Sequence, residues 1–192
     1  MPNWCSNSVV ITGKTEDIEN LENFLAENKG KNWFDYFLPT PEELKDTEAL
    51  SDASEEKTAE LIEKYGYGDW YSWNINNWGV KWNCDVDQWD VNPTDVDGES
   101  DIRFYFDSPW AAPVELYEWI ENNTELTVVA EFHEEGMCFV GYYEDGASES
   151  FDYTDMESLD DIPEYLVENW GLRDSIEDRE SMFDEDEDGE DK

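Results

Sequence analysis

Basic residues are scarce in this 192-residue chain, which has 11 lysines and arginines against 52 aspartates and glutamates. The formal net charge is −41, and there is one histidine. Proteins that bind DNA or RNA directly neutralise phosphates with lysine and arginine. The composition therefore argues against direct binding to nucleic acid.

Cysteine is also sparse. The three cysteines, Cys5, Cys84 and Cys138, are an odd number and form no C-x-x-C pair. This spacing argues against a disulfide framework, a zinc site and an iron–sulfur cluster. We therefore expect free thiols buried in a core, a reducing compartment and, by default, a cytoplasmic protein without a metal or other cofactor.

Long apolar runs and common catalytic motifs are missing too. No stretch approaches the ~20 apolar residues of a membrane span, and the N-terminus lacks the basic and apolar regions of a signal peptide. His133 lacks the second histidine of an H-E-x-x-H zinc motif, and there is no phosphate-binding loop. Aspartates surround Gly98, but this glycine is out of register for an EF-hand. We expect no membrane association, no metal and no enzymatic activity.

Aromatic residues, by contrast, are plentiful: ten Trp, ten Tyr and nine Phe. Disordered chains are poor in large apolar residues, so most of this chain should fold. In the first half, a β-branched run predicts a strand at residues 6–12. A helix is expected from Thr15 to about residue 28, because Thr15 can cap it and acids follow in its first turn. A short strand is expected at residues 33–38, before two prolines.

The second half repeats this order. Residues 101–107 alternate between apolar and polar side chains, which predicts a strand, and Pro113 can begin a helix. Further strands are expected at residues 126–132, 137–143 and 148–153. The pair Asp145-Gly146 is typical of a tight hairpin turn between the last two.

Two β-α-β halves predict an α+β protein with a ferredoxin-like plait, an antiparallel sheet with helices on one face. The last hairpin would extend that sheet. We expect one domain over residues 1–155, with a helical, Trp-rich insertion at 40–80 in which Ser54 caps a helix. A short C-terminal helix is expected within 156–173. Residues 174–192 are an acidic tail whose composition predicts disorder.

Acidic residues are not confined to the tail. Residues 82–172 contain 25 acids and one base, a net charge of 1 − 25 = −24. A folded chain of this length is about 42 Å across, and a DNA duplex of that length carries about 25 charges. The amount of charge therefore suits an imitation of nucleic acid. The acids that we expect to contact a partner are Asp85, Asp87, Asp90, Asp95, Asp97, Glu99 and Asp101.

A second group of candidate residues is aromatic. Residues 65–82 carry four Trp and three Tyr, which indicates either a small aromatic core under a loop or a recognition surface. A tryptophan-lined cleft with two facing carboxylates would suit a sugar, but no spacing in the chain fixes such a pair. The tryptophans of a recognition surface would be Trp70, Trp73, Trp78 and Trp82.

Several short motifs occur in a characteristic order. They are PNWCSN (2–7), LPTPEEL (38–44), YGYGDWY (65–71), NWGVKW (77–82), FDSPW (106–110) and EEGM (134–137), followed by Phe139 and Gly141. Over residues 2–145 the chain resembles the YubB group of phage and plasmid proteins. The resemblance implies a ferredoxin-like domain with a Trp-rich insertion and a viral or mobile-element origin, and it implies no activity.

Two functions remain open for such a protein. As an acidic phage protein, it would imitate nucleic acid and occupy the basic groove of a host nuclease, CRISPR effector, restriction enzyme or transcription factor. Alternatively, it would be a scaffold or virion-associated protein that binds through its Trp-rich insertion, with the acids serving solubility only. The oligomeric state does not follow from the sequence.

Overall fold

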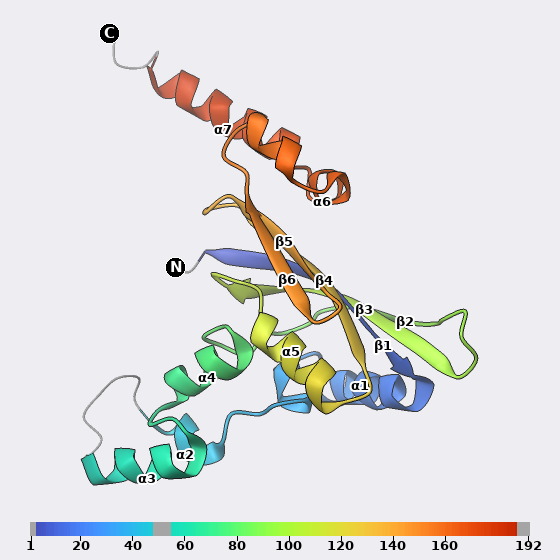
Figure 1. Ribbon diagram of the computed structural model, residues 1–192, viewed down its shortest axis with the longest axis vertical. Coiled ribbons are helices and arrows are strands. Elements are labelled where there is room, and N and C mark those ends of the chain that lie inside the picture. The colour runs from blue at the N-terminus through green and yellow to red at the C-terminus, as the bar shows by residue number, and fades with distance from the viewer. Residues whose placement is uncertain (1–2, 48–54, 188–192) are drawn as a thin grey trace.

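Six strands form one antiparallel sheet in the computed structural model, which describes residues 3–47 and 55–187 (Figure 1). The strands are β1 (Trp4–Lys14), β2 (Trp89–Pro93), β3 (Glu99–Pro109), β4 (Thr127–Glu134), β5 (Phe139–Glu144) and β6 (Ala147–Asp152). Their order across the sheet is β2-β3-β1-β4-β5-β6, so β1 pairs with both β3 and β4. The predicted α+β class is confirmed.

Two helices, α1 (Thr15–Asn28) and α5 (Val114–Asn123), cover one face of this sheet (Figure 1). Side chains of a strand alternate between its two faces, and the odd-numbered residues of β1 from Cys5 to Gly13 are buried on the helix side. The main hydrophobic core lies between the sheet and these helices. It includes Val9, Ile11, Ile18, Leu21, Leu25, Ile102, Phe104, Leu116 and Ile120.

The segment between α1 and β2 differs most from the expectation. Its elements are the 3-10 helix η1 (Trp33–Tyr36) and the helices α2 (Glu42–Lys45), α3 (Glu55–Tyr65) and α4 (Trp70–Trp78). The predicted strand at residues 33–38 is wrong. Trp33 and Phe34 are both buried in the same core, whereas consecutive side chains of a strand point to opposite faces.

The strand that pairs with β3 is instead β2, at the edge of the sheet. The helical insertion therefore runs over residues 29–88 rather than 40–80. Its two ends are tied together, since the Val86 N–H donates to the Gly30 carbonyl at 2.8 Å. A helix occurs where α3 was expected, although its predicted cap, Ser54, lies outside the described residues.

The second half follows the prediction closely. The expected strands occur as β3, β4, β5 and β6, and the expected helix occurs as α5. In the turn between β5 and β6, both Asp145 (φ 52°) and Gly146 (φ 73°) adopt left-handed backbone angles. Two such residues in succession make the type I′ turn that suits the twist of a hairpin.

The C-terminal segment contains the 3-10 helix η2 (Glu157–Asp161) and the helices α6 (Glu164–Asn169) and α7 (Leu172–Glu187). It packs around buried Val140, whose side chain lies on the face of β5 opposite α1 and α5. The prediction of helices on one face only is therefore wrong. Helix α7 covers residues 174–187, where disorder was expected. Leu172 and Ile176, near its start, lie one helical turn apart and are both buried in this second core.

Candidate functional site

Two of the four candidate tryptophans belong to the core. Trp73 and Trp78 are buried, and their rings meet edge to face at 5.6 Å between centroids. The Trp78 Nε1–H donates to the Leu38 carbonyl at 2.8 Å, so the indole nitrogen has an internal partner. The prediction that these two side chains contact a binding partner is wrong. Their burial supports the interpretation as a small aromatic core.

The other two candidate tryptophans reach the surface. Trp70 is half-buried against the main core. Trp82 is 38% exposed, and its ring lies 5.7 Å from that of Trp110, which is also exposed. The Lys81 ammonium lies 4.7 Å from the centre of the Trp82 ring, a cation–π contact.

The candidate acids fall into different environments. Asp101 is buried, and its carboxylate accepts two hydrogen bonds from the Arg103 guanidinium, at 2.9 and 3.1 Å. These bonds hold the pKa of Asp101 below its ordinary value. Its predicted role as an exposed contact residue is therefore wrong. Glu99 is half-buried at the start of β3.

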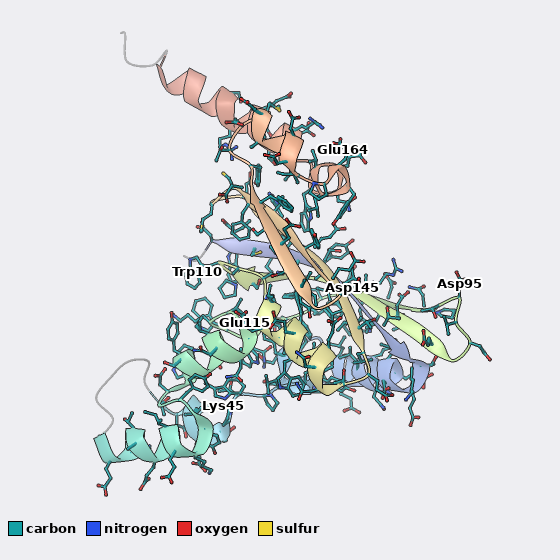
Figure 2. The ribbon with its side chains drawn as sticks, viewed as in Figure 1. Lys45, Asp95, Trp110, Glu115, Asp145 and Glu164 are labelled. Atoms are coloured by element: carbon teal, nitrogen blue, oxygen red, sulfur yellow. The ribbon has the colours of Figure 1, made fainter. Side chains whose placement is uncertain are left out.

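The remaining acids are exposed but do not form one cluster. Asp95 lies at the outer tip of the β2–β3 hairpin, away from Trp110 (Figure 2). Asp97 belongs to the same tip, and Asp90 lies on β2. Only Asp85 and Asp87 are brought beside Trp82, in the loop before β2. Other labelled acids, such as Glu164 on α6, lie elsewhere on the molecule (Figure 2).

Asp85, Asp87 and Trp82 line a hollow with a volume of about 640 Å³. The remaining wall comes from the start of β1, the end of β3 and Trp170, which follows α6. Asp85 is engaged, since it accepts hydrogen bonds from the Lys31 ammonium (2.5 Å) and the Asn32 N–H (3.0 Å). Burial opposes ionisation of Asp85, but these partners outweigh it and lower its pKa.

Other residues of this hollow come from the face of the sheet opposite α1 and α5 and were not predicted from the sequence. They are Trp4, Tyr105 and Asp107, with Trp170 beside them. Trp4 is 51% exposed and Tyr105 is 72% exposed. Asp107 accepts a hydrogen bond from the Ser6 hydroxyl at 2.8 Å. The alternation of residues 101–107 already placed Tyr105 opposite the buried phenylalanines, and that signal could have identified it.

Two polar atoms in the wall of the hollow have no hydrogen-bond partner among the described residues. Asn7 is 1% exposed, and its Nδ2 donates to two carbonyls and the Ser108 hydroxyl, yet its Oδ1 accepts nothing. The buried Nε1–H of Trp170 likewise has no acceptor. Buried polar groups in native proteins are normally paired. Asn7 points to the helix side of β1, whereas Trp170 lies beside Tyr105 on the opposite face, so only the Trp170 Nε1–H marks an unused donor on that face.

Two of the three cysteines, Cys5 and Cys84, lack a reactive environment. Burial, together with the nearby Glu134 carboxylate, raises the pKa of the Cys5 thiol to about 12, and burial also raises that of Cys84. A thiol is nucleophilic as the thiolate, so both groups are inert at neutral pH. Cys138 is half-buried, and its sulfur lies 2.5 Å from Nη1 of Arg179. No group of three or more His, Cys, Asp or Glu side chains suited to a metal occurs in the described part of the chain.

His133 packs against the second core. Its Nε2 lies 2.5 Å from the Tyr153 hydroxyl, and its ring packs between those of Tyr153 and Trp170. Burial lowers the pKa of His133, although the carboxylates of Glu135 and Glu134 oppose this effect. The imidazole is therefore held in its neutral form.

We expect His133 to make folding sensitive to mild acid. Its pKa is lower in the folded state, so the unfolded chain binds more protons, and its contribution to stability falls as pH drops below about 6.5. Urea unfolding of wild type and His133→Gln should show a difference that narrows between about pH 7.5 and pH 5.5. Weaker acid–acid repulsion at low pH affects both proteins alike. A difference that stays constant with pH would contradict a neutral, buried His133.

Comparisons with known proteins identify no family. No protein-family model matches the chain, and no curated protein matches it. Among solved structures, the crystal structure of a protein api92 from Yersinia pseudotuberculosis, described with the family model DUF1281, aligns with 81% of this chain and 99% of its own. The two sequences are 12% identical, and the TM-score is 0.41. In the described residues, no helix is long and apolar enough to cross a membrane.

Proposed function

We propose that this chain is a non-enzymatic accessory protein of a phage or mobile element, acting in the host cytoplasm. Its acidic surface would occupy a basic, nucleic-acid-binding host protein in place of nucleic acid. The motifs that resemble the YubB group support the origin. The large surplus of acids supports the partner's charge, since strongly charged surfaces attract opposite charge and speed association.

We further infer a ferredoxin-like plait within the larger sheet. The order β2-β3-β1-β4 is antiparallel throughout, with α1 following β1 and α5 joining β3 to β4. This is the pattern of two interleaved β-α-β halves. The hairpin of β5 and β6 then extends the sheet at the β4 side.

The observation that carries the proposed function is that the few lysines and arginines are paired with nearby carboxylates or aromatic rings. Six described ion pairs join a lysine or arginine to a nearby carboxylate. The cations are Lys14, Lys31, Lys45, Lys64, Arg103 and Arg173. Two more, Lys81 and Arg179, lie over aromatic rings. These cations are therefore neutralised locally, while most acids of the described residues form no ion pair, which leaves a negative field for a basic partner.

An affinity pull-down from host lysate tests this function. At about 0.1 M salt, where charges act over ~10 Å, we expect enrichment of a basic nucleic-acid-binding protein that added DNA displaces. At about 0.5 M salt, screening should release it. Absence of any basic protein at low salt would refute the proposal.

Two variants with equal charge changes locate the contact. In the first, Asp87, Asp90, Asp95 and Asp97 become asparagine. In the second, Glu168, Asp174, Glu177 and Asp178, which are exposed on or near the C-terminal helices, become the matching amides. We expect the first variant to lose more of the partner. Equal losses would mean that the whole coat acts together and that residues 87–97 have no special role.

A scaffold or virion-associated protein that binds through its insertion is the second candidate. The exposed pair of Trp82 and Trp110 favours it, since exposed aromatic residues are common anchors at interfaces. This alternative would be supported by a partner that stays bound at about 0.5 M salt and is not displaced by DNA. The same partner should no longer bind the Trp82→Ala variant.

A further inference from the structure

The end of β3 forms an unusual edge next to the hollow. β2 pairs with β3 only over residues 100–104. Beyond that point, in the described chain, residues 105–109 have β1 on one side and no paired strand on the other. The loop before β2 stands beside this length of β3, and the hollow lies among them.

The register places one acid between two exposed aromatic side chains. On β3, Tyr105 and Asp107 are two residues apart, so they share a face of the sheet with Cα atoms about 6.6 Å apart. Asp107 pairs with Ser6, and Trp4 is the next residue of β1 on that same face. A group bonded to the Asp107 carboxylate would therefore lie within reach of both rings.

These walls suit a flat organic cation. Exposed tyrosine and tryptophan rings attract cations through their π faces, and the carboxylates of Asp107 and Asp87 supply negative charge. Asp87 is exposed, and its carboxylate interacts electrostatically with the Lys31 ammonium, which is itself hydrogen-bonded to Asp85. A nucleotide or another phosphate would be repelled by the same carboxylates.

We propose that this hollow is the docking site for an arginine side chain on an extended basic segment of the partner protein. A guanidinium is planar, stacks on aromatic rings and donates paired hydrogen bonds to a carboxylate, whereas the lysine ammonium is a compact, strongly hydrated charge. Arginine therefore uses the ring faces and the Asp107 carboxylate together. The inference rests on the proposed function and specifies which chemical group of the basic partner the protein recognises.

The test uses two short synthetic peptides, one alternating glycine with arginine and one alternating glycine with lysine, at equal length and charge. Fluorescence anisotropy measures their binding to the full chain at about 0.1 M salt. We expect the arginine peptide to bind about threefold more tightly than the lysine peptide. Asp107→Asn should weaken binding of the arginine peptide by about tenfold and abolish the preference for arginine over lysine.

Matched controls separate the hollow from the general negative field. Asp174→Asn removes the same charge from an exposed position on α7, and Tyr165→Ala removes an exposed tyrosine from α6. We expect both variants to bind the arginine peptide with an affinity within about twofold of wild type. Tyr105→Ala, by contrast, should weaken its binding. In Asp107→Asn, the amide oxygen of the new side chain can still accept from the Ser6 hydroxyl. Unfolding curves of every variant verify that it is folded.

Three outcomes would overturn the docking site. They are no binding of either peptide to wild type, equal binding of arginine and lysine peptides, or equal losses for Asp107→Asn and Asp174→Asn. None of these outcomes depends on the pull-down, so the acidic surface as a whole could still bind a basic partner. Conversely, a failed pull-down with intact arginine preference would refute the proposed function and leave the hollow as an arginine site.

Discussion

Replacing Trp78 by alanine is expected to lower the free energy of unfolding by about 3–5 kcal/mol. Trp78 is 2% exposed, packs against Phe34 and Trp73, and donates its indole N–H to the Leu38 carbonyl. The substitution would leave a large cavity and an unpaired carbonyl in the core. By contrast, Trp82→Ala removes a partly exposed ring and should cost about 1 kcal/mol, the value of an aromatic pair.

Chemical denaturation of both variants measures this contrast. An unchanged slope with denaturant would confirm that the midpoint shift reports stability alone. If Trp82→Ala were as destabilising as Trp78→Ala, Trp82 would belong to the core and could not serve as an anchor for a partner. If Trp78→Ala were neutral, the insertion would not be part of the cooperative fold.

Local patterns predicted most of the regular elements. The strand near residues 6–12 and that at 101–107 have strong alternation or β-branched runs. The predicted Thr15 cap is wrong: α1 begins at Thr15 without a side-chain cap, and the Thr15 hydroxyl is hydrogen-bonded to that of Ser100 at 2.9 Å. β2 was missed because its sequence, WDVNP, combines one valine with Asp, Asn and Pro, which strands disfavour. The segment forms a strand because its backbone hydrogen-bonds to the edge of β3, a tertiary contact that local sequence does not show.

The hollow could be predicted only in part. Density of acids in the sequence drew attention to Asp85 and Asp87, and density of tryptophan to Trp82, and all three line the hollow. It failed for Asp101 and Trp78, because composition does not distinguish the two faces of a strand or helix. Trp4, Tyr105 and Trp170 meet at the hollow through the pairing of β1 with β3 and the docking of α6, which are separated by long stretches of sequence.

Gly30 should be the position in the insertion that tolerates a side chain least. It has φ +70°, and an added Cβ would lie 1.7 Å from the Val86 carbonyl oxygen, far inside contact distance. The backbone of Val86 cannot simply yield, because its N–H bonds to the Gly30 carbonyl at 2.8 Å. We expect Gly30→Ala to cost about 3 kcal/mol, from overpacking and from the left-handed backbone together.

Gly66→Ala is the matched control, since Gly66 has φ +80° but nothing within 4 Å of the added Cβ. It should cost only about 1 kcal/mol, the backbone strain alone. Denaturant unfolding of both variants therefore separates strain from the clash with Val86.

The contact between Gly30 and Val86 also affects the hollow, because Val86 lies between Asp85 and Asp87. Gly30→Ala should displace these carboxylates and weaken the arginine peptide, whereas Gly66→Ala should not. Equal stability losses would mean that the loop before β2 moves freely, and a hollow built on that loop could not discriminate arginine from lysine.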